Sequence, residues 1–159
     1  MSPDVAKRKM ALILEYVKQL EKYRDFSFDR YMKNRFAVER ILELLIVTAS
    51  DLVFHLLSER KEPPPVAYSA AFLRAGETGL ITNGLAERLA KAAGMRNVLV
   101  HGYETIDHRL VFKSMEKALK DFPELVKQVG KVFEKKKVSS KKTGRLREER
   151  PGDLGTGRL

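Results

Sequence analysis

The apolar residues of this chain recur at three- and four-residue steps along most of its length. This spacing gathers them on one side of an α-helix, whereas a half-buried strand would alternate apolar and polar residues. No alternating pattern longer than a few residues occurs. The sequence therefore predicts an all-α protein, an up-and-down helical bundle of four long helices plus one short helix.

The first two helices follow from where this periodicity starts and stops. Ser2 and Pro3 form a good helix start, and the first apolar stripe continues for about five turns before it breaks around residues 25–27. Ser27 can cap a second, longest helix over residues 28–58. The second half of that helix is apolar on most faces, which indicates burial on several sides, either centrally or partly against another subunit.

Prolines, glycines and capping residues divide the rest of the chain. Three prolines at 63–65 end the long helix, and a short helix is expected over about residues 69–76. A fourth helix begins after Thr82 or Asn83 and stops at Gly102, a residue that can take the left-handed conformation. The last helix is capped by Asp107 and continues to about residue 133, with Pro123 expected to kink or split it.

Apolar content falls away after Lys135, where glycine, serine and charged residues take over. We therefore predict a domain over residues 1–135 and a basic, flexible tail over residues 136–159. The tail holds eight Lys and Arg against three acidic residues, so half of the formal net charge of +10 belongs to it. Such a tail raises non-specific affinity for polyanions. A solvated extension is the preferred interpretation over a dedicated RNA-binding arm.

The composition of the chain indicates its class of protein and its cellular compartment. Hydrophobic residues make up 43% and charged residues 33% of the chain, as in soluble proteins rich in amphipathic helix. There is no cysteine, so disulfides and thiolate chemistry are excluded, which suits a reducing cytoplasm. The N-terminus lacks the pattern of a secretory signal, and the longest apolar run, residues 44–47, is too short to cross a membrane. We expect a cytoplasmic protein with no membrane partner.

The residues that bear on function lie together at positions 96–103. Arg96, Asn97, His101 and Tyr103 are interleaved there with the branched apolar residues 98–100. A helix that only needed burial would not carry these polar groups, and a fully solvated helix would not carry the apolar ones. We interpret this stretch as the wall of a small polar site at the end of the fourth helix.

Helix geometry relates the polar residues of this stretch to one another. Asn97 and His101 are four residues apart and share a face, so Asn97 could hydrogen-bond one imidazole nitrogen and fix which one faces outward. Arg96 and His101 are five apart, about 140° around the axis and roughly 7 Å along it. Either the long Arg96 side chain curls round, or two copies of the helix meet across a two-fold axis.

An arginine with a histidine suits phosphate chemistry. Arginine offers a planar donor fork to phosphate oxygens, and histidine moves protons near neutral pH. RNA carries its own nucleophile, the 2′-hydroxyl, so these groups could cleave it without metal or cofactor. The chain has no phosphate-binding glycine loop, dinucleotide fingerprint or Gly-x-Ser-x-Gly elbow. Its three histidines form no His-x-x-x-His pair, so zinc is not expected.

Other polar residues have more ordinary interpretations. Glu43 and Asp51 lie about 80° apart on the longest helix, and structural salt bridges are their preferred role, with support of a catalytic arginine as the lesser alternative. His55 is expected to be structural, and His108 exposed and inert. Tyr103, just past the helix end, is by default a packing residue.

The stretch Arg96-Asn97-x-x-Val100-His101-x-Tyr103 resembles the Arg-x4-His-x-Tyr signature of HEPN ribonuclease toxins of the HepT kind. The order of helices is similar as well, with Arg40-x-x-Glu43 and Asp51 on a long second helix and a short helix after a proline-rich turn. The resemblance covers roughly residues 5–134 and leaves out the basic tail.

This resemblance implies a homodimer of helical bundles whose two motifs face each other in a cleft and cleave RNA without metal. Arg96 and His101 would be the catalytic pair. From the helix geometry and burial considered above, Asn97, Glu43 and Asp51 are the candidate supporting residues. The resemblance also implies an antitoxin partner, an MntA-like nucleotidyltransferase that adds AMP to the motif tyrosine, here Tyr103. The added phosphate would place negative charge where the RNA phosphate should bind.

The sequence leaves two alternatives to a ribonuclease toxin. One is a non-catalytic partner subunit of a nucleotidyltransferase whose motif only docks nucleotide or RNA, in which case substitutions at Arg96 and His101 would alter binding without any turnover. The other is a purely structural helical dimer. The RNA substrate, the cleavage position and the choice between a dimer and a higher oligomer also stay open.

Overall fold

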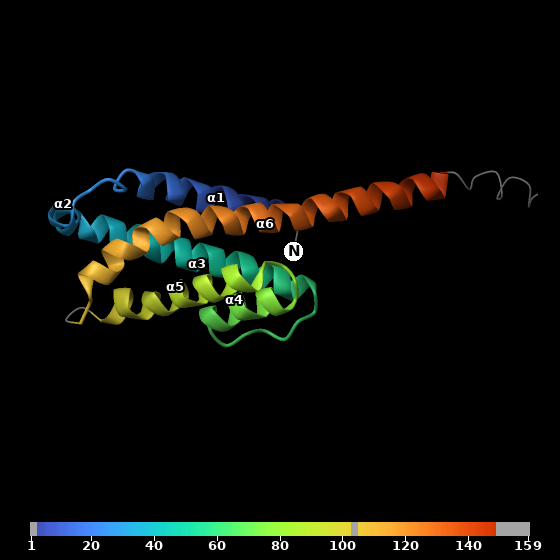
Figure 1. Cartoon of the computed structure of the whole chain (residues 1–159). Coiled ribbons are helices and arrows are strands. Elements are labelled where there is room, and N and C mark those ends of the chain that lie inside the picture. Colours follow the sequence, from blue (N-terminus) through green and yellow to red (C-terminus); the bar gives the residue numbers. More distant parts are fainter. Residues whose placement is uncertain (1–2, 103–104, 149–159) are drawn as a thin grey trace, which may run out of the picture.

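A computed structural model describes the backbone of residues 3–102 and 105–148, and the side chains of residues 4–102 and 105–135. Within these ranges the chain is helical throughout its regular structure, without a strand, which confirms the all-α class (Figure 1). The helices are α1 (Pro3–Glu21), α2 (Phe28–Lys33), α3 (Arg35–Glu59), α4 (Tyr68–Glu77), α5 (Asn83–His101) and α6 (His108–Glu148).

Side-chain caps set three of the helix starts, as the sequence predicts. The Ser27 hydroxyl accepts a hydrogen bond from the backbone N–H of Arg30 at 3.2 Å. The Thr82 hydroxyl accepts from the third residue of α5 at 3.3 Å, and the Asp107 carboxylate accepts from the third residue of α6 at 3.1 Å. Each cap satisfies a backbone donor that the first helical turn leaves unpaired. Ser2, the expected cap of α1, lies outside the described residues.

The prediction of one continuous helix over residues 28–58 is wrong, because the chain breaks at Asn34 into α2 and α3. The Asn34 side-chain amide donates to the backbone carbonyl of Arg30 at 2.8 Å, and its backbone N–H donates to that of Tyr31. Asparagine competes in this way with regular helical hydrogen bonding. The break turns Tyr31 fully into the core, and the bundle has two short helices instead of one.

Gly102 ends α5 as predicted, but not through a left-handed conformation. Its φ is −98° and its ψ is 39°, which residues other than glycine also adopt. The space around it is the stronger constraint, since a Cβ built on Gly102 would lie 2.8 Å from the carbonyl oxygen of Val98. The glycine is therefore required by close packing of the chain against the last turn of α5.

The last helix is longer than predicted and is not split. Pro123 lies inside α6, which continues through it to Glu148, well past residue 135 (Figure 1). The backbone at the start of the expected tail is therefore helical. The division into a domain of residues 1–135 and a flexible tail of residues 136–159 stays a prediction.

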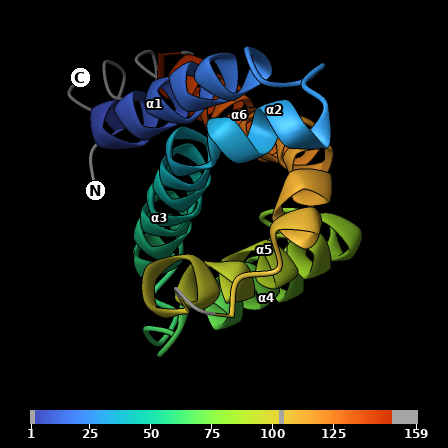
Figure 2. The ribbon, with the colours of Figure 1, turned by 90° about the vertical axis from the view of Figure 1, so that its left-hand side faces the viewer.

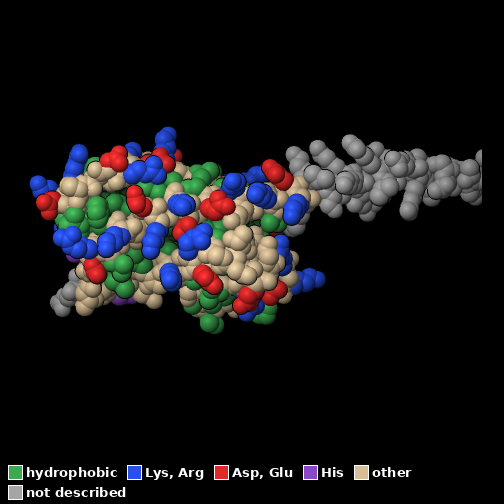
Figure 3. All heavy atoms as spheres, in the orientation of Figure 1, with side chains coloured by type: hydrophobic (Ala, Val, Ile, Leu, Met, Phe, Trp, Pro, Cys, Tyr) green, Lys and Arg blue, Asp and Glu red, His purple; other side chains and the backbone are tan. Residues whose placement is uncertain are grey.

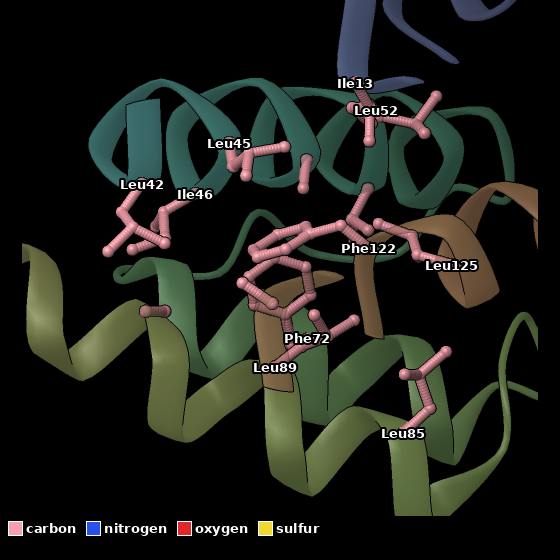
Figure 4. Close-up of a cluster of buried hydrophobic side chains, with 14 of the residues drawn as sticks. Ile13, Leu42, Leu45, Ile46, Leu52, Phe72, Leu85, Leu89, Phe122 and Leu125 are labelled. Carbon is pink, nitrogen blue, oxygen red and sulfur yellow. The ribbon is translucent and has the colours of Figure 1, made fainter. Parts of the chain in front are cut away.

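Helix α3 lies between α1 and α6 on one side and α4 and α5 on the other, and it packs against all four (Figure 1). Phe72 from α4 and Phe122 from α6 point toward each other beneath α3, among leucines of α3, α5 and α6 (Figure 4). Both phenylalanines are 1% exposed. Burial of such side chains is the main force that holds the helices together.

By length and composition α3 could cross a membrane, because its most apolar window has a mean hydropathy of 1.8. That window is 56% buried within the bundle, and the core helix of a soluble protein has the same composition. We interpret α3 as a core helix for this reason.

Polar contacts fix α5, which carries the motif, against α6. Arg88 donates from Nε to the buried carboxylate of Asp121 at 3.0 Å. Gln128 accepts from the backbone N–H of Thr82 at 2.9 Å. These bonds attach the first half of α5 to α6. The motif at the other end of α5 therefore belongs to a helix whose position is fixed.

Candidate functional site

The motif occupies the last turns of α5, at the end of the bundle where α3 and α6 begin (Figure 2). Its apolar residues divide between inside and outside, since Leu99 is buried whereas Val98 is 40% exposed. Asn97 and His101 are exposed, and Arg96 is partly buried. The end of α5 thus has a packed side and an open side, and Asn97 and His101 lie on the open one. The wall of a small polar site that the sequence suggests stays a prediction.

Arg96 packs against an aromatic ring rather than against His101. Its guanidinium carbon lies 5.2 Å from the centroid of the Tyr68 ring, and that ring is held edge-on by Phe54 at 6.0 Å. Its Nε is buried and has no hydrogen-bond partner in the described part of the chain. An unpaired buried donor is costly, and a phosphate oxygen is a ligand that the guanidinium geometry fits well.

The side chains of His101 and Asn97 make no hydrogen bond to any residue that the structure describes. The Asn97–His101 hydrogen bond that we considered possible is thus not formed in this protomer. Nor do Arg96 and His101 contact each other through a hydrogen bond within the described residues. The structure therefore leaves the imidazole accessible to an external group.

Glu43 and Asp51 form ion pairs with residues outside the motif. Glu43 lies 3.3 Å from Arg40 Nη1, and Asp51 lies 3.7 Å from Lys9 Nζ. Pairs this exposed contribute at most about 1 kcal/mol to stability. The geometry fits the structural salt bridges that the sequence favours, and a supporting role for these two carboxylates in catalysis stays a prediction.

His55 and His108 differ in how far their side chains are buried. His55 is exposed on α3 and not part of the core. The expectation that His108 is exposed is wrong, because its side chain is only 30% exposed and its Nδ1 is buried. Tyr103, the expected modification site, lies outside the described residues.

His108 belongs to a buried polar cluster that the sequence did not indicate. Its Nδ1 lies 3.8 Å from Oε1 of Glu39, whose side chain is 14% exposed, near the buried Tyr31. Burial raises the pKa of Glu39, and the positive charges of His108 and Arg35 oppose this more weakly. Burial, reinforced by Glu39, raises the pKa of Tyr31 to about 12. In the sequence, the only indication that Glu39 is buried is its position beside Val38, a core residue.

The raised pKa of Glu39 predicts a pH dependence of folding. The folded state holds a proton at Glu39 in a range where the unfolded chain, with a pKa near 4.5, has lost it. The stability that the Glu39 carboxyl contributes is therefore fully present below pH 4.5, and it is lost as the pH rises through the raised pKa of the folded state. We expect Glu39→Gln to flatten that decline in urea unfolding measured from pH 4 to 8. Equal pH profiles for the variant and the wild type would contradict this.

Metal ligands do not gather at this site. Among the described residues, no group of three or more His, Cys, Asp or Glu side chains could hold a metal ion. The described donors near the motif are instead a guanidinium, an amide and an imidazole. That set is suited to binding an anion and transferring protons.

This chain is an all-α bundle with an Arg-x4-His motif at the end of α5, and the side chains of that motif suit anion binding and proton transfer. Comparison with known protein families narrows this class of helical bundle to one family. A family model described as ribonuclease HepT-like matches residues 13–129, so the chain belongs to the HepT-like ribonuclease family. The resemblance drawn from the motif is thereby confirmed.

Two curated relatives agree with this assignment. The chain is 32% identical over 132 residues to the tRNA nuclease HepT of Aphanizomenon flos-aquae, covering 81% of this chain and 90% of the relative. It is 25% identical over 125 residues to the mRNA nuclease HepT of Shewanella oneidensis, covering 77% of this chain and 94% of the relative. Both relatives are matched over nearly their whole length.

A solved structure has the same fold. It is a tri-AMPylated HEPN toxin of Shewanella oneidensis in complex with an MNT antitoxin. It superposes with a TM-score of 0.74 at 24% identity, over 82% of this chain and 98% of that protein. This likeness confirms the fold.

Proposed function

We propose that this protein is a ribonuclease toxin that acts as a homodimer and cleaves RNA with Arg96 and His101, without metal. The observation that carries the proposal is the geometry at the end of α5, in a chain of the HepT-like ribonuclease family. There an arginine with an unpaired donor is held on an aromatic ring, close along the helix to an exposed histidine.

The proposed reaction uses the 2′-hydroxyl of RNA as the nucleophile. One His101 accepts the 2′-hydroxyl proton while the O2′–P bond forms, and a second His101 donates a proton to the 5′-oxygen as the P–O5′ bond breaks. Arg96 donates to the phosphate oxygens and stabilises their developing charge. The products are a 2′,3′-cyclic phosphate and a free 5′-hydroxyl.

Two protomers would supply the two histidines that this reaction needs. Exposed apolar side chains support such pairing at the motif end, where Phe36 of α3 is 73% exposed and Leu110 of α6 is 59% exposed. Patches of this kind commonly mark protein interfaces.

We further propose that a nucleotidyltransferase antitoxin silences the protein by adding AMP to Tyr103. The AMPylated Shewanella toxin in complex with its MNT antitoxin supports this. The transferred phosphate would carry negative charge two residues from His101, and it would repel the RNA phosphate that Arg96 binds. We assign the pair to the cytoplasm, where RNA and nucleotides are available.

Expression in a bacterial host tests the toxin proposal. The wild-type chain alone should stop growth, and co-expression with a cognate nucleotidyltransferase should restore growth and add AMP-sized mass increments to the protein. Tyr103→Phe should lose an increment and remain toxic. Growth unaffected by an unmodified, soluble wild-type chain would instead favour the non-catalytic partner subunit.

The stacking of Arg96 on Tyr68 predicts a positioning role for the tyrosine ring. Tyr68→Leu removes the ring face, and we expect kcat/KM for RNA cleavage to fall about 3- to 30-fold, as the loss of one cation–π contact implies. Tyr68→Phe keeps the ring and should retain activity, which separates this role from that of the hydroxyl. Equal activity of the Leu and Phe variants would contradict the role.

A further inference from the structure

The outward face of α6 carries a row of lysines. On an ideal helix they fall within an arc of about 80° and extend over roughly 33 Å of its length. The row consists of Lys113, Lys117, Lys120, Lys127, Lys131 and Lys135. Arg109, in the first turn of α6, lies on the same arc. This regular spacing distinguishes the row from lysines scattered over a solvated surface.

The charges of the lysine row are not neutralised within the described part of the chain. All six side chains are exposed, and none forms an ion pair with a residue that the structure describes. Glu124 lies on the same arc, and the exposed Glu116 and Glu134 lie about 20° outside it without forming an ion pair with the row. The Glu124 carboxylate is partly buried and accepts a hydrogen bond from Gln128 at 3.0 Å. The row is therefore free to bind an external anion.

The position of the lysine row relates it to the motif. Helix α6 begins seven residues after His101, at the same end of the bundle, and runs from there along its full length (Figure 1). In Figure 3, basic side chains recur over the visible face from that end to the start of the grey tail, with acidic ones among them. A chain of phosphates bound at His101 could thus continue along α6.

Other partners fit the lysine row less well. A second copy of the same surface would be repelled by it. A membrane-binding helix needs exposed apolar side chains beside its basic ones, whereas the apolar face of α6 is buried in the bundle from Val111 to Val129. A long row of positive charge with little apolar surface is what a nucleic-acid backbone requires.

We infer that the lysine row of α6 binds the RNA backbone beyond the cleavage site. This inference rests on the proposed ribonuclease function and adds to it a surface that holds substrate away from Arg96 and His101. Such contacts bind phosphates irrespective of base sequence. They would position a long RNA across the bundle without selecting the cleaved base.

The test compares two triple variants with the same change in net charge, each in a His101→Ala background that prevents cleavage. The row variant carries Lys117→Gln, Lys120→Gln and Lys127→Gln. The control variant carries Lys7→Gln, Lys18→Gln and Lys22→Gln, which are exposed positions on or just after α1. Binding of a fluorescent single-stranded RNA is followed by anisotropy over a range of salt concentrations. Vesicles of phosphatidylcholine and phosphatidylserine are the second probe.

The row variant should lower the slope of log K against log salt by about 2, because each lost phosphate contact removes about 0.7 from it. The control variant should keep the parental slope. Equal slopes for the two variants would overturn the inference, as would a row variant that loses only vesicle binding. Because binding is read without cleavage, these outcomes are distinct from failure of the proposed function, which appears as wild-type protein that leaves RNA intact.

Discussion

Replacing His101 with alanine is expected to lower RNA cleavage by a factor of about 10² to 10⁴, the usual contribution of a positioned general acid or base. The side chain is exposed and makes no hydrogen bond to a described residue, so its loss should not disturb the fold. Cleavage of a labelled RNA at saturating concentration, with a thermal unfolding curve for each protein, measures both effects.

His55→Ala is the matched control, because His55 is also exposed but lies in the second half of α3, away from the motif. It should cleave RNA at the wild-type rate. If His101→Ala and His55→Ala cleaved equally well, the catalytic assignment of His101 would be wrong. A decrease in His101→Ala that is accompanied by a lower melting temperature would point to a structural role instead.

Truncation of the core is expected to give the largest effect on stability. Phe72→Ala should reduce the free energy of unfolding by about 3–5 kcal/mol, because it empties a fully buried site where α4 packs against α3 and α5. Phe72 is 1% exposed and lies among leucines of α3, α5 and α6 (Figure 4). Urea unfolding followed by circular dichroism measures the change.

Leu73→Ala provides a control on the same helix, since Leu73 is 43% exposed. It should cost well under 2 kcal/mol, as expected for a partly exposed position. A Phe72→Ala protein no less stable than Leu73→Ala would contradict the packing of α4 beneath α3.

Most helix starts could be predicted from the sequence because they depend on local chemistry. Ser27, Thr82 and Asp107 each pair with a backbone donor only three residues away, so their roles are visible in the sequence. The break at Asn34 was missed because the apolar spacing continues through it. Only the competition of its amide for a backbone carbonyl shows that the helix ends there.

The candidate site could be predicted only in part, for a related reason. The motif and its position at the end of α5 follow from spacing along one helix. The contact of Arg96 with Tyr68 joins residues 28 positions apart, and the pairing of Glu39 with His108 joins residues 69 positions apart. Such contacts depend on how the helices pack, which periodicity within one helix does not specify.

We propose that this chain cleaves RNA by itself, without metal. The most direct measurement is cleavage of total RNA by purified wild-type protein in EDTA, after intact mass spectrometry shows that it carries no AMP. We predict cleavage that leaves 2′,3′-cyclic phosphate ends and that is unchanged when Mg²⁺ replaces EDTA. RNA left intact by this unmodified, folded protein in both conditions would contradict the claim.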